Sequence, residues 1–310
     1  MKQKLIGIVG PTASGKTGIG VALAKALNGE VISADSMQLY RGIHIASAAP
    51  DLEERDGIEH HLIEILSEDE CCTVAEYVTM ARQKIEEVFL RGRQPIVVGG
   101  TGLYINALFD HTQFFSEAED PVVRGRLEEE YETVGAEALL SRLQEIDPET
   151  AARLHPNDRR RIVRALEVFE KTGQTLTALN EQSHGEELPY DVVLIGLTYR
   201  DRERLYERIN KRVDLMLEAG LLEEARSTFG RVGTHGMSQA IGHKELYAYF
   251  EGDKTLEEAA ESLKQATRRY AKRQLTWFRR DERIHWIEMD ETKDALAEIL
   301  KIIHGKEETA

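Results

Sequence analysis

Short apolar runs alternate with amphipathic stretches in the first third of the chain. The runs at residues 5–9, 30–34 and 94–98 have the length of buried strands, and a turn rich in glycine or polar residues follows each. Between them, residues 19–27 and 73–89 show apolar positions at helical spacing. Strands that alternate with helices predict an α/β fold built on a parallel sheet.

The pattern changes in the middle of the chain. From residue 114 to residue 187 strand signals are absent and helical periods dominate, and an apolar run at 192–197 then restores the strand pattern. We therefore predict an α/β core at 1–113 and 188–310 that is interrupted by a helical insertion at 114–187. The remaining expectations are an irregular segment at 43–72, helices at 122–131, 136–146, 159–172, 201–219, from 255 onward and at 295–303, and a strand at 284–287.

The turn after the first apolar run has the spacing G-x-x-x-x-G-K-T. An expected strand precedes it and an expected helix follows, which is the context of a phosphate-binding loop, because backbone N–H groups and the helix N-terminus then point at a bound anion. In such a loop Lys16 supplies a charge for the outer phosphate and the Thr17 hydroxyl is placed to hold Mg²⁺. The motif does not say whose phosphate chain binds. Its residues are Gly10, Pro11, Thr12, Ala13, Ser14, Gly15, Lys16 and Thr17.

Two further strand ends carry candidate chemistry. The second run delivers Asp35, and ligands of open α/β sheets bind at the carboxyl ends of strands. Asp35 is thus either a functional carboxylate near the loop or the cap of a following turn. The third run ends in glycines and Thr101, where P-loop ATPases usually carry an Asp. Together Thr17, Asp35 and Thr101 favour group transfer with water excluded.

Composition narrows the partners. The net charge of −15 argues against a non-specific nucleic-acid coat and still allows a local basic patch. Cys71 and Cys72 are adjacent, which disfavours a disulfide and suits a reducing cytoplasm. No apolar run is long enough for a membrane span and no signal peptide is recognisable, so we expect no membrane partner. We expect a monomer.

Arginines cluster in the expected insertion. Arg160, Arg161 and Arg164 share one face at helical spacing, which suits either RNA or a solvated, ion-paired surface. A late helix interleaves basic residues with Tyr270 and two other aromatics, which equally fits an RNA contact or the helix dipole. The pair at residues 60–61, two histidines, lacks a metal-ligand spacing and is interpreted as structural.

These motifs together resemble the tRNA dimethylallyltransferase family, also called tRNA isopentenyltransferases. The resemblance extends over nearly the whole chain in the family's order. Two departures are that His243 stands where a Tyr is expected and that the zinc-finger extension of eukaryotic members is absent, which points to the bacterial form. The matching stretches are GPTASGKT at 10–17, DSMQLYRG at 35–42, VGGTGLY at 98–104, HPNDRRRIVRALEVFEKTG at 155–173, QAIGHKEL at 239–246 and RRYAKRQLTWFR at 268–279.

The resemblance implies a P-loop NTPase-like sheet and a specific reaction. A dimethylallyl group would move from dimethylallyl diphosphate to N6 of the adenine 3′ of the tRNA anticodon. The P-loop and Arg212 would bind the diphosphate, and Thr17 would hold Mg²⁺. The catalytic residues would be Asp35, as the base, and Thr101, which would hold the adenine or the diphosphate. The implied tRNA contacts are Asp35, Ser36, Met37, Gln38, Thr101, Arg124, Arg160, Arg161 and Arg164.

Two other function classes remain open from the residues alone. One is a small-molecule or nucleotide kinase, in which Asp35 would activate a hydroxyl and ATP would bind tightly. The other is a nucleotide-switched binding protein that hydrolyses NTP slowly. The strand end without an acidic residue disfavours both, although ATP binding at the loop is compatible with every reading.

Overall fold

The structure is a computed structural model that describes residues 2–110, 120–183, 188–230 and 240–305. The chain divides into two compact units, one formed by residues 1–109 and 189–310 and the other by residues 110–188. The boundaries predicted from the sequence, after 113 and after 187, lie at segments outside the described residues.

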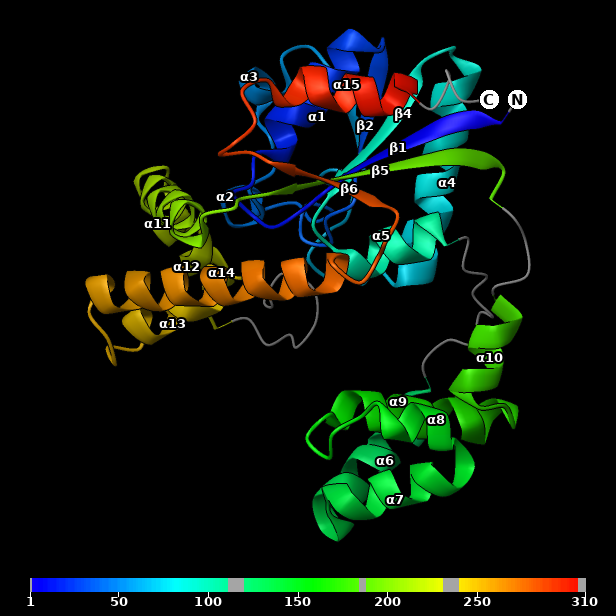
Figure 1. Cartoon of the computed structure of the whole chain (residues 1–310). Coiled ribbons are helices and arrows are strands. Elements are labelled where there is room, and N and C mark those ends of the chain that lie inside the picture. Colours follow the sequence, from blue (N-terminus) through cyan, green and yellow to red (C-terminus); the bar gives the residue numbers. More distant parts are fainter. Residues whose placement is uncertain (1, 111–119, 184–187, 231–239, 306–310) are drawn as a thin grey trace. The chain divides into compact units, whose positions relative to one another are not determined.

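The first unit is built on a six-stranded sheet in the order β3-β2-β4-β1-β5-β6 (Figure 1). Every pairing in it is parallel, as the alternation of strands and helices predicts. The α/β prediction is thus confirmed. The strands are β1 (Gln3–Val9), β2 (Gly29–Ser33), β3 (His60–His61), β4 (Gln94–Gly99), β5 (Tyr190–Thr198) and β6 (Ile284–Glu288).

Helices cover both faces of this sheet (Figure 1). Successive side chains of a strand point to opposite faces, so Ile6 and Ile8 of β1 pack in the core beneath α1 and α15, while Leu5 and Val9 pack in the core beneath α4 and α5. Both faces of the central strands are therefore apolar. The covering helices are α1 (Lys16–Ala26), α4 (Val74–Leu90), α5 (Gly102–Phe109) and α15 (Ala295–Gly305).

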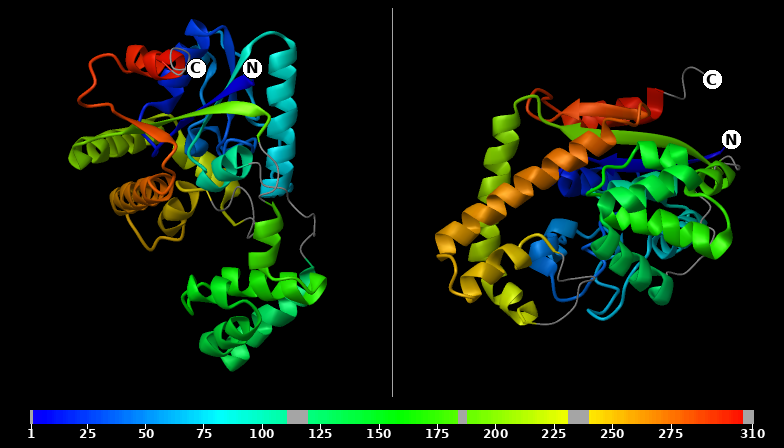
Figure 2. Two further views of the ribbon diagram at one scale, coloured as in Figure 1. Left: turned by 45° about the vertical axis from the view of Figure 1, so that its right-hand side comes forward. Right: turned by 90° about the horizontal axis from the view of Figure 1, so that it is seen from below.

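A helical layer extends the first unit beyond the sheet. Its longest member, α14, packs against α11, α13 and α5, and both views of Figure 2 show it beside α13. Leu246, Leu263 and Val213 form the buried centre of this layer. The remaining helices of the unit are α2 (His44–Ser47), α3 (Leu52–Arg55), α11 (Arg202–Glu218), α12 (Leu221–Thr228), α13 (His243–Phe250) and α14 (Leu256–Phe278).

The second unit is entirely helical in its described residues. Leu127, Leu143, Ile162 and Leu166 lie at the centre of its own apolar core. Buried Glu167 accepts the backbone N–H of Asp120 at 2.8 Å and so fixes the start of α6. Its helices are α6 (Pro121–Val134), α7 (Ala136–Ile146), α8 (Pro148–Ala152), α9 (Arg159–Thr172) and α10 (Leu176–Ser183).

The capping signals locate several helix starts correctly. Thr73 and Thr255 each form a complete capping box, and Asp201 caps α11 through the N–H of Glu203. The polar pair Asn157-Asp158 before α9 predicts an N-cap, and Asp158 occupies that position, but its side chain makes no capping bond, so this expectation is wrong in part.

The expectation of an irregular segment at 43–72 is also wrong in part. It contains α2, α3 and the two-residue edge strand β3. Elements this short have no measurable periodicity, and the one local signal among them is the capping-box spacing of Asp51 and Glu54 at the start of α3. Among the described residues, none of the helices combines the length and the apolar character that crossing a bilayer requires.

Candidate active site

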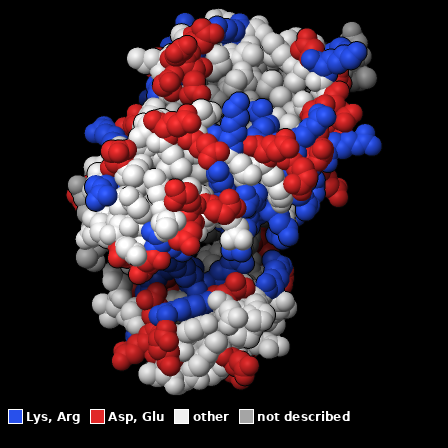
Figure 3. Space-filling view, turned by 90° about the vertical axis from the view of Figure 1, so that its left-hand side faces the viewer, with Lys and Arg blue, Asp and Glu red and all other residues white. Residues whose placement is uncertain are grey.

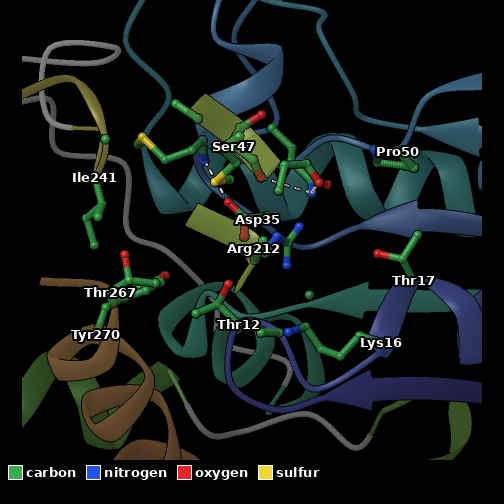
Figure 4. Close-up of a pocket in the computed structure, with 18 of the residues that line it drawn as sticks. Thr12, Lys16, Thr17, Asp35, Ser47, Pro50, Arg212, Ile241, Thr267 and Tyr270 are labelled. Carbon is green, nitrogen blue, oxygen red and sulfur yellow. Dashed lines mark hydrogen bonds between the residues drawn. The ribbon is translucent and has the colours of Figure 1, made fainter. Parts of the chain in front are cut away.

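The carboxyl ends of three neighbouring strands meet at one edge of the sheet. Strands β2, β4 and β1 are adjacent, and they lead into Asp35, the turn around Thr101 and the P-loop respectively. A cavity of about 720 Å³ opens there, and the described residues that line it belong to the first unit (Figure 4). Lys16, Thr17, Asp35 and Arg212 all line it.

The P-loop adopts a backbone that its glycines make possible. Gly10 has φ 143°, and a Cβ there would lie 2.5 Å from the carbonyl oxygen of Leu197. Gly15 has φ 95° and serves as the N-cap of α1, so the helix begins at Lys16 with its N-terminus facing the cavity. Pro11 and Ser14 are buried in the loop, and the Ser14 hydroxyl has no partner among the described residues.

Lys16 is held across the loop. Its Nζ donates to the carbonyl oxygen of Pro11 at 2.7 Å. Burial lowers the pKa of Lys16 to about 7, against the attraction of the nearby Asp35 carboxylate. An anion in the cavity would therefore find a cation that has little water around it.

Asp35 both caps a turn and faces the cavity. Its Oδ1 accepts the N–H of Met37 at 2.9 Å, which is the capping role considered from the sequence. Burial raises the pKa of Asp35 above its ordinary value, although the Met37 N–H and the Lys16 ammonium oppose the shift. A carboxylate has about four lone-pair sites, so capping leaves capacity for a proton.

Thr101 lies behind the cavity wall. Its Oγ1 accepts the N–H of Ser36 at 3.0 Å and lies 3.3 Å from the Ser36 hydroxyl. Thr101 is not among the residues that line the cavity, whereas Ser36 and Met37 are. In this geometry Thr101 orients the loop that follows Asp35.

Gln38 is tied into the wall of the cavity through its amide. Its Nε2 donates to the carbonyl oxygens of Ala48 at 3.2 Å and Ser47 at 3.5 Å, and its Oε1 accepts from the Ser33 hydroxyl at 2.7 Å. Since an amide oxygen carries two lone pairs, one acceptor site on Oε1 is left for a ligand.

Helix α11 contributes two cations to the cavity. Arg212 points toward Asp35 and Lys16 (Figure 4), and burial lowers the pKa of its guanidinium. Arg208 also lines the cavity, and it donates from Nε to the carbonyl oxygen of Ala13 at 3.0 Å, which braces the P-loop. The sequence singled out Arg212 and gave Arg208 no separate role.

Helix α14 supplies contacts that sequence reasoning missed. Gln274 donates from Nε2 to the carbonyl oxygen of Gly100 at 3.0 Å and accepts the N–H of Thr12 on Oε1 at 2.9 Å. The Thr12 N–H is therefore occupied by Gln274 in this structure and is not offered to a phosphate. An amide suits both partners, because its NH₂ group donates to the Gly100 carbonyl oxygen while its oxygen accepts the Thr12 N–H.

Tyr270, from the same helix, also lines the cavity. Burial raises the pKa of its phenol, and the side chains of Thr101 and Gln274 lower it by hydrogen bonding. The sequence leaves the basic and aromatic residues of 268–279 open to either an RNA contact or a helix-dipole role, and neither alternative assigns Tyr270 to the cavity.

Comparisons with known proteins agree with this geometry. The model of the family described as IPP transferase matches residues 38–281. The chain belongs to the IPP transferase family. A tRNA dimethylallyltransferase of Bacillus subtilis is 50% identical over 291 residues, which cover 93% of this chain and 91% of that protein.

Solved structures of IPP transferases give the same assignment. The tRNA isopentenylpyrophosphate transferase of Bacillus halodurans is 47% identical, with a TM-score of 0.73 over 99% of this chain and 97% of that one. A eukaryotic dimethylallyltransferase acting on tRNA is 31% identical, with a TM-score of 0.83 over 98% of this chain and 79% of that one.

The arginines suggested for RNA lie on the second unit of this IPP transferase. Arg160 and Arg161 are exposed on α9 and form no ion pair within the described residues. Arg164 pairs with Glu167 at 2.9 Å, and Arg124 lies 3.5 Å from Glu128. On the face shown in Figure 3, Lys and Arg are interspersed with Asp and Glu, in keeping with local basic patches on an acidic chain.

The two histidines at 60–61 have partners that support a structural role. His61 lies 2.6 Å from buried Glu30, which also binds Arg91, and His60 contacts the carbonyl oxygen of Ile58 at 2.9 Å. Among the described residues no cluster of His, Cys, Asp and Glu is suited to hold a metal on its own.

Proposed function

We propose that this IPP transferase moves a dimethylallyl group from dimethylallyl diphosphate to N6 of the adenine that follows the tRNA anticodon. The observation that carries the proposal is that the P-loop, Asp35 and Arg212 line one cavity. In addition, β4, which ends at this edge of the sheet, is followed by glycine and Thr101 and not by an acidic residue. The tRNA dimethylallyltransferase relatives, similar over nearly their whole length, support it.

The donor side of the cavity would stabilise the leaving group. Lys16 and Arg212 would neutralise the diphosphate, and the helix N-terminus behind Gly15 adds partial positive charge. The donor set also fits Mg²⁺, because the cavity offers the Thr17 hydroxyl beside the P-loop, and Mg²⁺ at such sites keeps several waters and binds largely through substrate phosphates. When bound through Thr17, the ion would supply further charge neutralisation for the diphosphate.

The acceptor side of the cavity would remove one proton from N6 of the adenine. The bond between the allylic carbon and the diphosphate oxygen breaks as the bond from N6 to that carbon forms, and the N6 proton passes to Asp35. The pKa of Asp35 is raised by burial, which brings its basicity closer to the demand of the step. The free lone pair on Gln38 Oε1 would accept the second N6 hydrogen, and Ser36 and Met37 would contact the adenine.

The RNA itself would be held mainly through phosphates. Arg160 and Arg161 are the exposed cations of α9, and Arg124 and Arg164 would join them by exchanging carboxylate partners for phosphate. The adenine must leave its stack to reach the cavity, as other base-modifying reactions require. We further propose that a single copy acts in the cytoplasm, where the free thiols of Cys71 and Cys72 would stay reduced.

The test is a labelling experiment with three components. The protein is incubated with Mg²⁺, dimethylallyl diphosphate labelled in its prenyl group, and a tRNA anticodon stem-loop. Label should enter the RNA, and RNA with inosine in place of the target adenine should stay unlabelled. If no label is transferred and ATP is instead consumed with a small hydroxylated substrate, the kinase reading replaces this one.

A further inference from the structure

Helix α2 depends on a residue far away in the sequence for its position. The helix has four residues, none of them buried, and its N-cap residue Ile43 makes no side-chain capping bond. Instead, the carboxylate of Glu224 on α12 accepts the N–H of Ile45 at 2.7 Å and the N–H of Ala46 at 2.9 Å. These two charge-assisted bonds fasten α2 to the helical layer.

His243 holds that carboxylate in place. Its imidazole is fully buried, with Nε2 3.0 Å from Glu224 Oε1 and Nδ1 2.9 Å from the Thr228 hydroxyl. The Tyr247 hydroxyl contacts Thr228 at 2.9 Å. A nearly buried carboxylate is costly unless it is paired, so the imidazole and the two backbone amides together keep Glu224 in its orientation.

The far end of α2 bears on the active site. Ala46, Ser47 and Ala48 line the cavity, and the carbonyl oxygens of Ser47 and Ala48 receive the amide of Gln38. The close-up in Figure 4 shows Ser47 next to Asp35 in this wall. Because Gln38 lies in the same cavity wall as Asp35, the candidate general base, a shift of α2 would displace the Gln38 amide within the active site.

We propose that Glu224, oriented by His243, is a positioning residue for the adenine that accepts the dimethylallyl group. It fixes α2, and α2 holds the Gln38 amide with one lone pair of Oε1 toward the incoming adenine. This inference rests on the proposed function, because it assigns the Gln38 side of the cavity to the adenine of the tRNA and the P-loop side to the diphosphate. Among the described residues, none of the hydrogen bonds that join Glu224, His243, α2 and Gln38 involves the P-loop, so donor binding should not depend on this network.

The test uses Glu224→Gln and His243→Phe in the full chain. Single-turnover transfer is measured against stem-loop concentration at saturating donor, beside donor affinity by titration. We expect the stem-loop concentration for half-maximal rate to rise about tenfold, as loss of a charged hydrogen bond implies, with donor affinity unchanged. His243→Gln, which retains a donor for Glu224, should recover most of the loss.

A matched control is present on α2 itself. His44 pairs with Glu64 at 3.2 Å, and both side chains are partly exposed. This pair does not link the α2 backbone to α12, as Glu224 does. His44→Phe should therefore leave the RNA dependence unchanged.

The outcomes distinguish a failure of the proposed function from a failure of the positioning role of Glu224. If the unsubstituted protein transfers no label, the proposed function fails and this inference falls with it. If the unsubstituted protein is active and the variants keep its RNA dependence, or lose donor and RNA affinity in parallel, only the positioning role is refuted. Should His243→Phe unfold, as melting curves would show, Glu224→Gln and His243→Gln decide the question.

Discussion

Two groups of cations in this IPP transferase differ in their surroundings. Lys16 and Arg212 lie in the cavity, and burial lowers the pKa of both. On α9 the cations face solvent, and two of them are already paired, Arg164 with Glu167 and Arg159 with Glu132. One group is small and desolvated, and the other is hydrated and partly neutralised.

The difference indicates what each group can contribute. Charges with little water around them interact strongly over short distances and are poorly screened, which suits a leaving group that gains charge during reaction. Hydrated charges act mainly through counterion release from a polyanion and depend strongly on salt. An acidic chain can therefore serve two anionic ligands with few cations, provided that the cations differ in exposure.

The largest effect should come from the carboxylate between the cavity cations. Asp35→Asn preserves shape but cannot take the N6 proton, and loss of a general base lowers rates by about 10² to 10⁴. We expect single-turnover transfer at saturating donor to fall by that factor while donor affinity stays nearly intact. The control is Asp51→Asn, which alters an exposed capping carboxylate on α3. A collapse of donor affinity with a normal saturated rate would instead assign Asp35 to metal binding.

A second substitution tests directly whether the cavity cations and the α9 cations bind different ligands. Lys16→Ala removes a desolvated charge from the P-loop, so dimethylallyl diphosphate should bind roughly ten- to a hundredfold more weakly. Affinity for the stem-loop should hardly change. Lys25→Ala, on the exposed side of the same helix, is the matched control because its partner is the surface residue Asp56. Equal losses for both ligands would contradict the division between the two groups.

The titration of Lys16 gives a third measurement. Its pKa of about 7 in the free protein should rise when diphosphate binds, because the anion favours the protonated amine. Binding therefore takes up a proton above pH 7, and donor affinity should fall between pH 7 and 9 by at most about tenfold per unit. Calorimetry in buffers of different ionisation enthalpy measures the uptake. Lys16→Met should flatten the profile, and a flat profile in the unsubstituted protein would refute the assignment.

The smallest effect is expected for the exposed group. Replacing Arg160, Arg161 and Arg164 with Glu should reduce the log–log salt slope of stem-loop binding, since each phosphate contact contributes roughly 0.7 to 0.9. Arg160 and Arg161 should account for most of the change because Arg164 already has Glu167 as a partner. Arg153→Glu serves as the control; Arg153 is the C-cap residue of α8, and its present partner is Glu149. An unchanged slope in the triple variant would leave α9 as a solvated surface.

Part of the site follows from local sequence. The P-loop, Asp35 and the turn at Thr101 each come directly after an apolar run, and the carboxyl ends of parallel strands share one edge of the sheet. Their assembly could be predicted without knowing the strand order. The order did matter for one detail, because only adjacency of β2 and β4 lets the Thr101 hydroxyl reach the backbone of Ser36.

The rest depends on contacts that no local pattern encodes. Gln274 bonds to Thr12 across 262 positions of sequence, and its helical neighbours Tyr270 and Arg273 resemble any basic, aromatic surface stretch. Arg208 and Arg212 lie one helical turn apart and both line the cavity, yet Arg208 bonds to the P-loop backbone whereas Arg212 points toward Asp35. Such roles are decided by how α11 and α14 pack, which periodicity does not specify.

The insertion also affects the order in which the chain can fold. Strand β1 pairs with β4 before residues 110–188 and with β5 only after them, from Gln3 opposite Tyr190 to Val9 opposite Gly196. The contacts of the helical unit are local in sequence and can form early, whereas the pairing of β1 with β5 must wait for a long loop to close. During synthesis one edge of β1 therefore stays unpaired while the helical unit is already complete, and an apolar strand edge is the part of a nascent chain most prone to associate with others.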